Sequence, residues 1–413
     1  MDGHVPILGG RLIMINAVLS AIPTHFMTCF IWPKKGVELL DKLRRIFFWD
    51  IKDQNGAGHC LVAWNIAMQS KENGGLGIRN LREHNKALLC KFLSKVLQST
   101  ETPCYQWLAD WYLKNEIPLS CKTLDTATWR TFSSLIPLVQ NSTKCKLGSG
   151  NRISFWYDHW TNEGNLRSRY PNLFSFAKTQ QCTVASQFTG TWTIDLHPNL
   201  SHTATAELHD LNNRLGSITP EAQAPDIRIA SLGKAATTSY FYKLNTFAGV
   251  GWEPYDFVWD PIIPKKYSVF LWLAFRNRLN TRENMFKKNW TVSTHAGCEL
   301  CPALETISHI LLRCRAAQQV WRQLNIEDVA ANSIEILDFA VTATELFEPL
   351  WHIAFAASAV ILWEARNAKI FENQSMNGTM VTKKISDTLK LWSNRAKKQH
   401  TKEGILQWAN KFT

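Results

Sequence analysis

Several short motifs that mark enzymes do not occur in this sequence. It contains no Gly-x-Ser-x-Gly and no His-Glu-x-x-His, which mark the nucleophile of many hydrolases and the zinc site of many metalloproteases. Its glycine-rich stretch Gly74–Gly77 does not continue into Gly-Lys-Ser or Gly-Lys-Thr, so it predicts a turn rather than a phosphate-binding loop. These absences argue against the common hydrolase and P-loop classes.

The sequence also lacks the cysteine pattern of a secreted, disulfide-stapled protein. Of its ten cysteines, only Cys298 and Cys301 form a Cys-x2-Cys pair, and the others are scattered. The chain begins Met1-Asp2-Gly3-His4, without a basic leader before an apolar run. We therefore expect an intracellular protein, nuclear or cytoplasmic, that is not secreted and meets reducing conditions.

Only one hydrophobic run is long enough to suggest a membrane span. Residues 12–33 contain no Asp, Glu, Lys or Arg, which is about the length that crosses a bilayer. Asn16 and His25 interrupt the run, and Pro23 would leave carbonyl groups unpaired in lipid. A buried helix that ends at Pro23 explains the run better, so we expect no membrane partner.

What the sequence does contain is enough apolar material for a large folded protein with a basic surface. The 413 residues are 45% hydrophobic and 19% charged, and 46 Lys and Arg outnumber 34 Asp and Glu to give a net charge of +12. This excess of positive charge favours a polyanionic partner, and RNA or DNA is the first candidate. The charge is also compatible with a basic surface that only keeps the protein dispersed.

Helical spacing dominates the chain, and we expect a mainly α fold with minor β structure. Helices are predicted at about 11–22, 37–49, 80–97, 205–215, 239–244, 267–275, 280–288 and 347–371. The helix over 37–49 has Val37, Leu40, Leu43 and Phe47 on one face, which predicts a core stripe. Gly9-Gly10 is interpreted as a turn before the first helix.

The middle of the sequence is rich in tryptophan. Gly148–Asn151 followed by Ile153 and Phe155 predicts a short β-hairpin, and most of the tryptophans are expected in the core rather than stacked on bases. The neighbours Asp158 and His159 suggest an acid and base, but adjacent side chains diverge in a strand, so a turn is the better interpretation.

We expect five regions along the chain. They are a helical thumb-like region at 1–100, a Trp-rich connector with the hairpin at 101–180, a polar variable linker at 181–229, a small zinc module at 230–326 and a helical basic tail at 327–413.

The strongest chemical pattern is a set of four possible metal ligands. Cys298-x2-Cys301-x7-His309-x4-Cys314 supplies three thiolates and one imidazole, which suits a closed, structural Zn²⁺ site rather than a catalytic one. His309 and Cys314 would point about 140° apart on one regular helix, so a helix is expected to begin between them. A chance meeting of cysteines and histidines is the alternative, and His295 could replace His309.

These ligands lie in a longer pattern that resembles the zinc-binding domain following reverse transcriptase in plant LINE-type (non-LTR) retrotransposons. The matching residues include Ser268–Ala274, Arg278–Thr281, Cys298–Cys301, Glu305-Thr306, His309, Cys314 and Val320-Trp321. Further similarity to the part of these polyproteins after the polymerase palm comes from 10–12, 15–24, Arg44-Arg45, Phe48-Trp49, 62–64, 74–78, Asn85, 87–89, 148–150, Phe155-Trp156, Asp158, Trp363, Arg366-Asn367 and Phe371.

The resemblance implies that Cys298, Cys301, His309 and Cys314 are the zinc ligands. The family's polymerases keep an adjacent Asp pair on the palm for two-metal chemistry, and this sequence has no Asp-Asp dipeptide. A ribonuclease H domain, which related elements add, is not expected either, because beyond Glu372 only Asp387 and Glu403 supply carboxylates. The chain is expected to begin downstream of fingers and palm, and not to be an enzyme.

The implied role is that of a zinc-binding and nucleic-acid-binding remnant of a reverse transcriptase. RNA or DNA and other parts of a polyprotein are the expected partners, with no small-molecule substrate. Charge and proximity select six candidate phosphate contacts, Arg44, Arg45, Lys287, Lys288, Arg313 and Arg315. The alternative is a structural or protein-interaction module, or an inert degenerate fragment, in which zinc only stabilises the fold.

Overall fold

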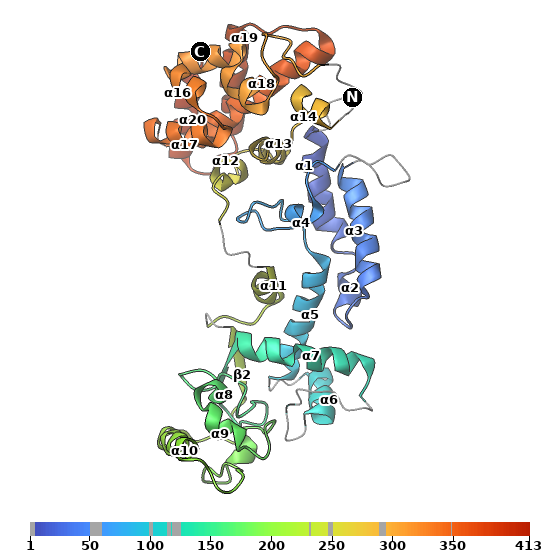
Figure 1. The fold of residues 1–413 in the computed structure, drawn as a ribbon, viewed down its shortest axis with the longest axis vertical. Helices are drawn as coiled ribbons and strands as arrows, with labels where there is room; N and C mark the ends of the chain where they lie inside the picture. The colour runs from blue at the N-terminus through green and yellow to red at the C-terminus, as the bar shows by residue number, and fades with distance from the viewer. Residues whose placement is uncertain are drawn as a thin grey trace. The chain divides into compact units, whose positions relative to one another are not determined.

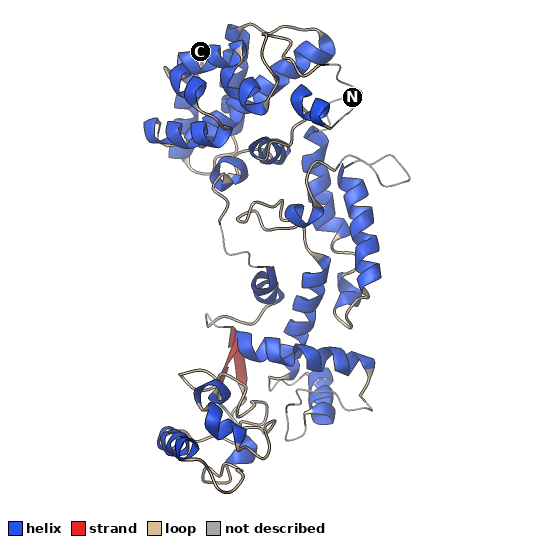
Figure 2. Ribbon diagram, in the orientation of Figure 1, coloured by secondary structure: helices blue, strands red, loops and turns tan. Residues whose placement is uncertain are grey.

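The structure is a computed structural model of the chain. It describes residues 5–49, 60–98, 102–113, 117, 125–230, 233–246, 251–288, 295–347 and 349–413. The described part is mostly helical, with one small sheet of two strands, which confirms the predicted fold class (Figure 2). None of its helices is long and apolar enough to cross a membrane.

The chain forms two compact units. We call Met1–Leu19, Asp41–Arg79 and Ala248–Thr413 the terminal unit, and Ser20–Leu40 with Asn80–Phe247 the central unit. Helix α3 (Lys34–Trp49) contributes to both. The other elements of the terminal unit are α1 (Val5–Met14), the π-helical turn η1 (Ile15–Leu19), α4 (Trp64–Ala67), α12 (Tyr255–Trp259), α13 (Lys265–Phe275), α14 (Arg282–Lys287), the π-helical turn η3 (His309–Arg313), α15 (Arg315–Gln323), α16 (Glu327–Asn332), α17 (Ile336–Leu346), α18 (Trp351–Glu372), α19 (Gly378–Ser393) and α20 (Gln399–Asn410).

The core of the terminal unit is built around α18 (Figure 1). Every residue from Ile353 to Trp363 is buried, so this helix is apolar on all faces and needs neighbours on all sides. Helices α12, α13, α15, α17, α19 and α20 and the turn η3 all pack against it. The expected helix at 347–371 is confirmed, although it begins at Trp351.

The first helix differs from its prediction. Helix α1 begins at Val5 and contains Gly9 and Gly10, which we had interpreted as a turn. Gly9 lies against the first turn of α13, where a Cβ atom would be 2.6 Å from the Cα of Lys266. Its lack of a side chain therefore permits close helix packing, which local sequence does not distinguish from a turn.

Helix α3 corrects the predicted core stripe. Val37 is buried, but Leu43 is 55% and Phe47 is 38% exposed. Arg44 is buried instead, with its guanidinium 2.6 Å from the Asp41 carboxylate and 2.7 Å from the Arg79 carbonyl. An arginine held by internal partners replaces part of the apolar face that periodicity predicted.

The central unit contains the elements between residues 20 and 247. They are α2 (Thr24–Met27), α5 (Leu81–Val96), α6 (Pro103–Tyr112), α7 (Ala127–Ser142), β1 (Thr143–Lys146), α8 (Leu166–Arg169), α9 (Pro171–Ser175), the 3-10 turn η2 (Ala185–Gln187), α10 (His202–Leu215), β2 (Ile227–Ala230) and α11 (Thr238–Thr246). Asn80 caps α5 by accepting hydrogen bonds from the Arg82 and Glu83 amides. Helices α7 and α11 pack against α5.

The predicted hairpin at 148–156 is wrong. Strand β1 precedes the glycine turn and pairs antiparallel with the distant β2, with Thr143 opposite Ala230. The turn itself wraps a carboxylate, because the amides of Gly148, Gly150 and Arg152 each donate to Asp226 at 2.9 Å. A buried acid of the same chain thus occupies the amide groups of the glycine turn.

Residues 181–229 are not the linker that we expected. Cys182, Val184, Leu211 and Leu215 are buried in one core cluster with aromatic residues from 153–170. The predicted helix at 205–215 is present as α10. Trp129, Trp156 and Trp160 are buried as expected, whereas Trp107 and Trp111 are exposed and stack on each other.

Candidate metal centre

Two cysteines of the candidate site lie on a tight turn between α14 and η3. The Leu300 amide donates to the Cys298 sulfur at 3.4 Å, and the Cys298 amide donates to the Ala303 carbonyl at 2.8 Å. Gly297 and Leu304 form an antiparallel bridge at the base of this turn. The turn therefore presents both sulfurs on one side, as a Cys-x2-Cys metal ligand pair requires.

The other two ligands are brought together by the π-helical turn η3. The Cys314 amide donates to the His309 carbonyl at 2.7 Å, which is the i to i+5 bond of a π turn. This wider turn aligns residues five apart that a regular helix would separate. Cys314 then occupies the N-cap position of α15, which begins at Arg315, directly after the second ligand rather than between the two as expected.

All four ligand atoms converge on one point. The three sulfurs and one imidazole nitrogen lie within 4.8 Å of one another, with Cys298 and Cys314 sulfurs 4.0 Å apart and Cys301 sulfur 3.1 Å from His309 Nε2. Tetrahedral zinc with Zn–S bonds near 2.3 Å requires about 3.8 Å between sulfurs. The donor set and its spacing fit a zinc ion with four protein ligands.

Two thiols of the cluster interact with each other even without a metal ion. The hydrogen bond between Cys314 and Cys298 lowers the pKa of Cys298 to about 3 and raises the pKa of Cys314. One thiolate is thus favoured at neutral pH, and binding a cation would release the remaining protons. His295 is not part of the cluster, because it lies beside Arg282 and accepts from the Gly297 amide.

Glu305 ties the metal turn to the rest of the terminal unit. This carboxylate is fully buried and accepts hydrogen bonds from the Arg282 amide at 2.9 Å and from Arg366 Nε at 3.3 Å. Arg282 in turn donates to the Gly297 carbonyl and pairs with Glu299 on the metal turn. The sequence contained a signal for this support, since Glu305 belongs to the pattern that resembles the zinc-binding domain and Arg366 to the further similarity outside it.

A cleft with basic side chains lies in the same unit. Its volume is about 1040 Å³, and its lining includes Thr306–Ser308, which directly precede the ligand His309. Of the six candidate phosphate contacts, Lys287 and Arg313 line it. Two arginines at the end of α13, Arg276 and Arg278, line it as well, and sequence reasoning did not select them.

The remaining candidates are not brought into this cleft. Arg45, Lys288 and Arg315 are not among its lining residues. Arg44 is only 2% exposed and lies over the Trp64 ring, so its selection as a phosphate contact is wrong. Acidic groups are also present, because Glu253, Glu283 and Glu335 line the cleft.

No second metal-binding group of three or more ligands occurs among the described residues. Asp158 and His159 were expected in a turn, but Asp158 lies in a bend just after a turn and His159 forms an isolated β-bridge with Lys144. Asp158 is fully buried and pairs with Arg228 at 2.7 Å, which makes it part of the core rather than a general acid or base. None of the nine cysteines that the structure describes forms a disulfide.

Comparison with known proteins agrees with this geometry. Residues 237–321 match the family described as zinc-binding in reverse transcriptase. An Arabidopsis thaliana protein named "Putative ribonuclease H protein" is 25% identical over 327 residues, which cover 76% of this chain and 51% of that protein. An "Uncharacterized mitochondrial protein" of Arabidopsis thaliana is 28% identical over 143 residues, covering 34% of this chain and 92% of that protein.

The chain thus spans about half the length of the first of these relatives. The family match ends at Trp321, just beyond the last of the four candidate ligands, and therefore includes all of them. The chain therefore contains the zinc-binding domain of a reverse transcriptase, and the match together with the two plant relatives supports an origin in the C-terminal region of a retrotransposon-derived reverse transcriptase.

Proposed function

We propose that this chain binds one structural zinc ion and uses the basic cleft beside it to hold single-stranded RNA or DNA without catalysing a reaction. The observation that carries the proposal is the position of the cleft. Its wall at Thr306–Ser308 runs directly into the ligand His309, so zinc binding would set the shape of the wall.

Zinc has a structural role in this proposal. Three thiolates and an imidazole fill a tetrahedral coordination sphere and leave no position for water or substrate. Side chains of the protein also support the site, because Glu305 and Arg282 hold the metal turn against its neighbours. The ion would supply folding free energy, on the order of 10 kcal/mol in small zinc modules.

The chemistry of the cleft suits a nucleic-acid strand. Arg278 is exposed, and Lys287 is exposed with its amine 2.7 Å from Glu283. The Arg276 guanidinium lies 5.5 Å from the centre of the Trp252 ring, so the lining contains a cation beside an aromatic ring. Cations that contact phosphates and rings that stack on bases are the two components of sequence-tolerant single-strand binding.

The proposal is tested by binding of a fluorescent single-stranded RNA to the zinc-loaded chain at several salt concentrations. Affinity is expected to fall steeply with salt. The double variant Arg278→Gln/Lys287→Gln should bind more weakly and reduce the slope of log K against log salt by roughly 1.4, or about 0.7 for each lost phosphate contact. Arg315→Gln, outside the cleft lining, is the control and should bind like the unaltered chain.

Salt-independent affinity, or an equal effect of the control, would favour the alternative of a structural or protein-interaction module. The non-catalytic part of the proposal rests on the sequence, which has no Asp-Asp pair. It is tested separately by primer extension with Mg²⁺, where any template-dependent product contradicts it.

A further inference from the structure

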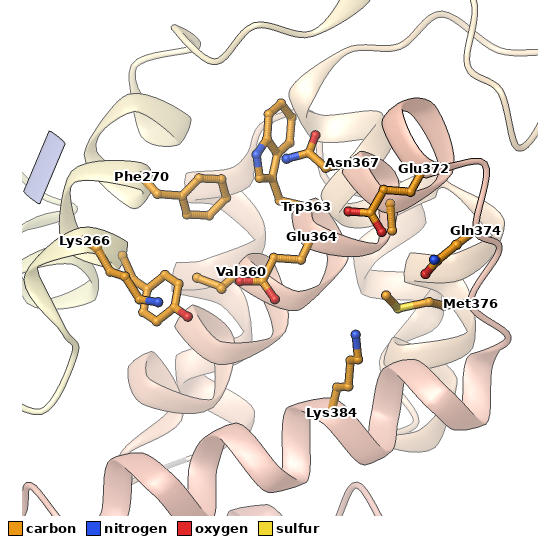
Figure 3. A pocket seen from close by; sticks show the side chains of 12 residues that line it. Lys266, Phe270, Val360, Trp363, Glu364, Asn367, Glu372, Gln374, Met376 and Lys384 are labelled. Carbon is orange, nitrogen blue, oxygen red and sulfur yellow. The ribbon is translucent and has the colours of Figure 1, made fainter. Parts of the chain in front are cut away.

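A second cavity, distinct from the basic cleft, opens in the terminal unit between α13, α18 and α19 (Figure 3). Its volume is about 360 Å³, within the range of pockets that take small ligands. Its lining includes Lys266, Tyr267 and Phe270 of α13, Trp363 and Glu364 of α18, and Lys384 of α19.

One wall of the cavity is aromatic. The rings of Phe270 and Trp363 lie with their centres 5.9 Å apart, and Tyr267 adds a third ring. The Lys266 amine lies 4.3 Å from the centre of the Tyr267 ring, which places a cation at the edge of this wall. Phe270 is 2% and Trp363 is 8% exposed, so the wall offers a ligand an apolar contact surface rather than an open ring face. A cation beside this wall suits an anionic substituent on an apolar ligand ring.

The other side of the cavity carries acidic, amide and basic side chains. Glu364 and Glu372 supply carboxylates, Asn367 and Gln374 supply amides, and Lys384 points from α19 into the space between Glu364 and Met376 (Figure 3). Among the described residues, neither carboxylate lies within 4.0 Å of a lysine amine of the cavity. The carboxylates and the lysine amines therefore face the same space without forming ion pairs with each other.

Burial raises the pKa of Glu364, although Lys266 and Lys384 act in the opposite direction. A ligand that donates hydrogen bonds to this carboxylate would stabilise its charged form and offset the cost of its burial. The cavity therefore combines an aromatic wall, hydrogen-bond acceptors and separate cations.

We propose that this cavity binds a purine nucleotide, with the base packed against the aromatic wall, the Glu364 carboxylate accepting from the base edge, and Lys384 paired with the phosphate. Guanine fits best, because it presents a ring N–H and an amino group side by side as two donors to one carboxylate. Adenine offers an amino group without the adjacent ring donor, and uracil offers a smaller apolar surface.

The proposal goes beyond the strand-binding cleft and beyond the sequence expectation of no small-molecule ligand. It is tested by calorimetric titration of the full zinc-loaded chain with GMP, guanosine, AMP and UMP. GMP is expected to bind most tightly. Lys384→Ala should weaken GMP binding about tenfold and leave guanosine binding unchanged, because only GMP carries the phosphate. Lys383→Ala, on the same helix but outside the cavity lining, is the matched control.

A second variant separates base recognition from folding. Glu364→Gln keeps the size of the side chain and should remove the preference for GMP over AMP, since the amide presents only one acceptor oxygen. An oligouridine ending in a single guanosine tests whether the base arrives on a strand, and its binding should respond to Glu364→Gln as GMP does. Retained GMP binding in Arg278→Gln/Lys287→Gln shows that the cavity acts independently of the cleft.

Three outcomes would overturn the proposal. They are no saturable binding of any of the nucleotides, equal binding by Lys384→Ala and Lys383→Ala, and tighter binding of an aromatic amino acid, whose ammonium and carboxylate would satisfy the same charges. Failure of strand binding in the cleft, by contrast, would leave the GMP result unaffected.

Discussion

Glu305, next to the metal turn, and Arg366, on the buried helix α18, form an ion pair from which water is excluded. The Glu305 side chain is fully buried and the Arg366 side chain is 6% exposed. Arg366 also lies 4.9 Å from the centre of the Trp363 ring, so one guanidinium contacts both the support of the metal site and the aromatic wall of the cavity. Removing one partner alone would leave a buried charge without compensation.

We therefore expect Arg366→Met to lower the free energy of unfolding of the terminal unit by about 3–5 kcal/mol, measured by urea denaturation with zinc present. The double variant Glu305→Gln/Arg366→Met should be less destabilised than Arg366→Met, because it removes both charges. Arg322→Met is the control, since its side chain is 70% exposed and should change stability by less than about 1 kcal/mol. Equal losses in single and double variants would contradict the ion-pair account.

Metal content tests the candidate ligands directly. The chain purified under reducing conditions should contain one zinc ion, and Cys301→Ser should lose it because serine does not replace a thiolate ligand. Cys29→Ser, which changes an exposed cysteine of the central unit that is not among the four candidate ligands, should retain the ion. A chelator should lower the melting temperature of the unaltered chain and have little further effect on Cys301→Ser. A metal-free protein with full stability would exclude the site.

Two neighbouring glycines of α1 should respond oppositely to the same change. Gly9→Ala places a methyl group 2.6 Å from backbone atoms of Lys266 and should destabilise the terminal unit by about 1–3 kcal/mol. Gly10→Ala meets nothing within 4 Å and should stabilise the helix by up to about 1 kcal/mol. Thermal unfolding of both variants measures this. Two changes of the same sign would show that α1 and α13 do not approach as closely as described.

Lys71 makes stability depend on pH. Burial, with repulsion from Lys265, lowers its pKa to about 8, against 10.5 for a free lysine. Between these values the unfolded chain binds more protons than the folded chain, so this group's contribution makes the folded state more stable as pH rises from 8 towards 10.5. Below pH 8 the full penalty of the buried charge is present.

Accordingly, Lys71→Met should be more stable than the unaltered chain at pH 7, and this advantage should shrink as the pH approaches 10. Denaturation at several pH values measures the difference between the two proteins, which cancels the titration of other groups. Lys383→Met, at an exposed lysine, should show no such trend. A stability difference that stays constant from pH 7 to pH 10 would contradict the lowered pKa.

Features that depend on neighbouring residues were predictable from the sequence. Helix α5 was expected at 80–97 and extends from Leu81 to Val96, because Asn80 is a strong cap and the apolar spacing is regular. The four ligands of the metal centre were also identified by their order and spacing, and they converge in the structure. In both cases the information lies within a short stretch of chain.

Tertiary structure decided the features that depend on distant residues. Periodicity does not show that Gly9 will face Lys266, that Arg44 will be buried, or that β1 will pair with a strand far along the chain. The polar composition of 181–229 also concealed a folded segment, because a few apolar side chains suffice when aromatic residues elsewhere complete the core.

For the candidate metal centre, the sequence determined which atoms are available to a metal, and the fold determined how they are held. The ligand types and spacing follow from local chemistry. The π turn that aligns His309 with Cys314 and the buried pair of Glu305 with Arg366 follow from packing against α18, which lies beyond the ligands in sequence. Ligand identity is a property of side chains, whereas their support comes from long-range contacts that only the folded chain assembles.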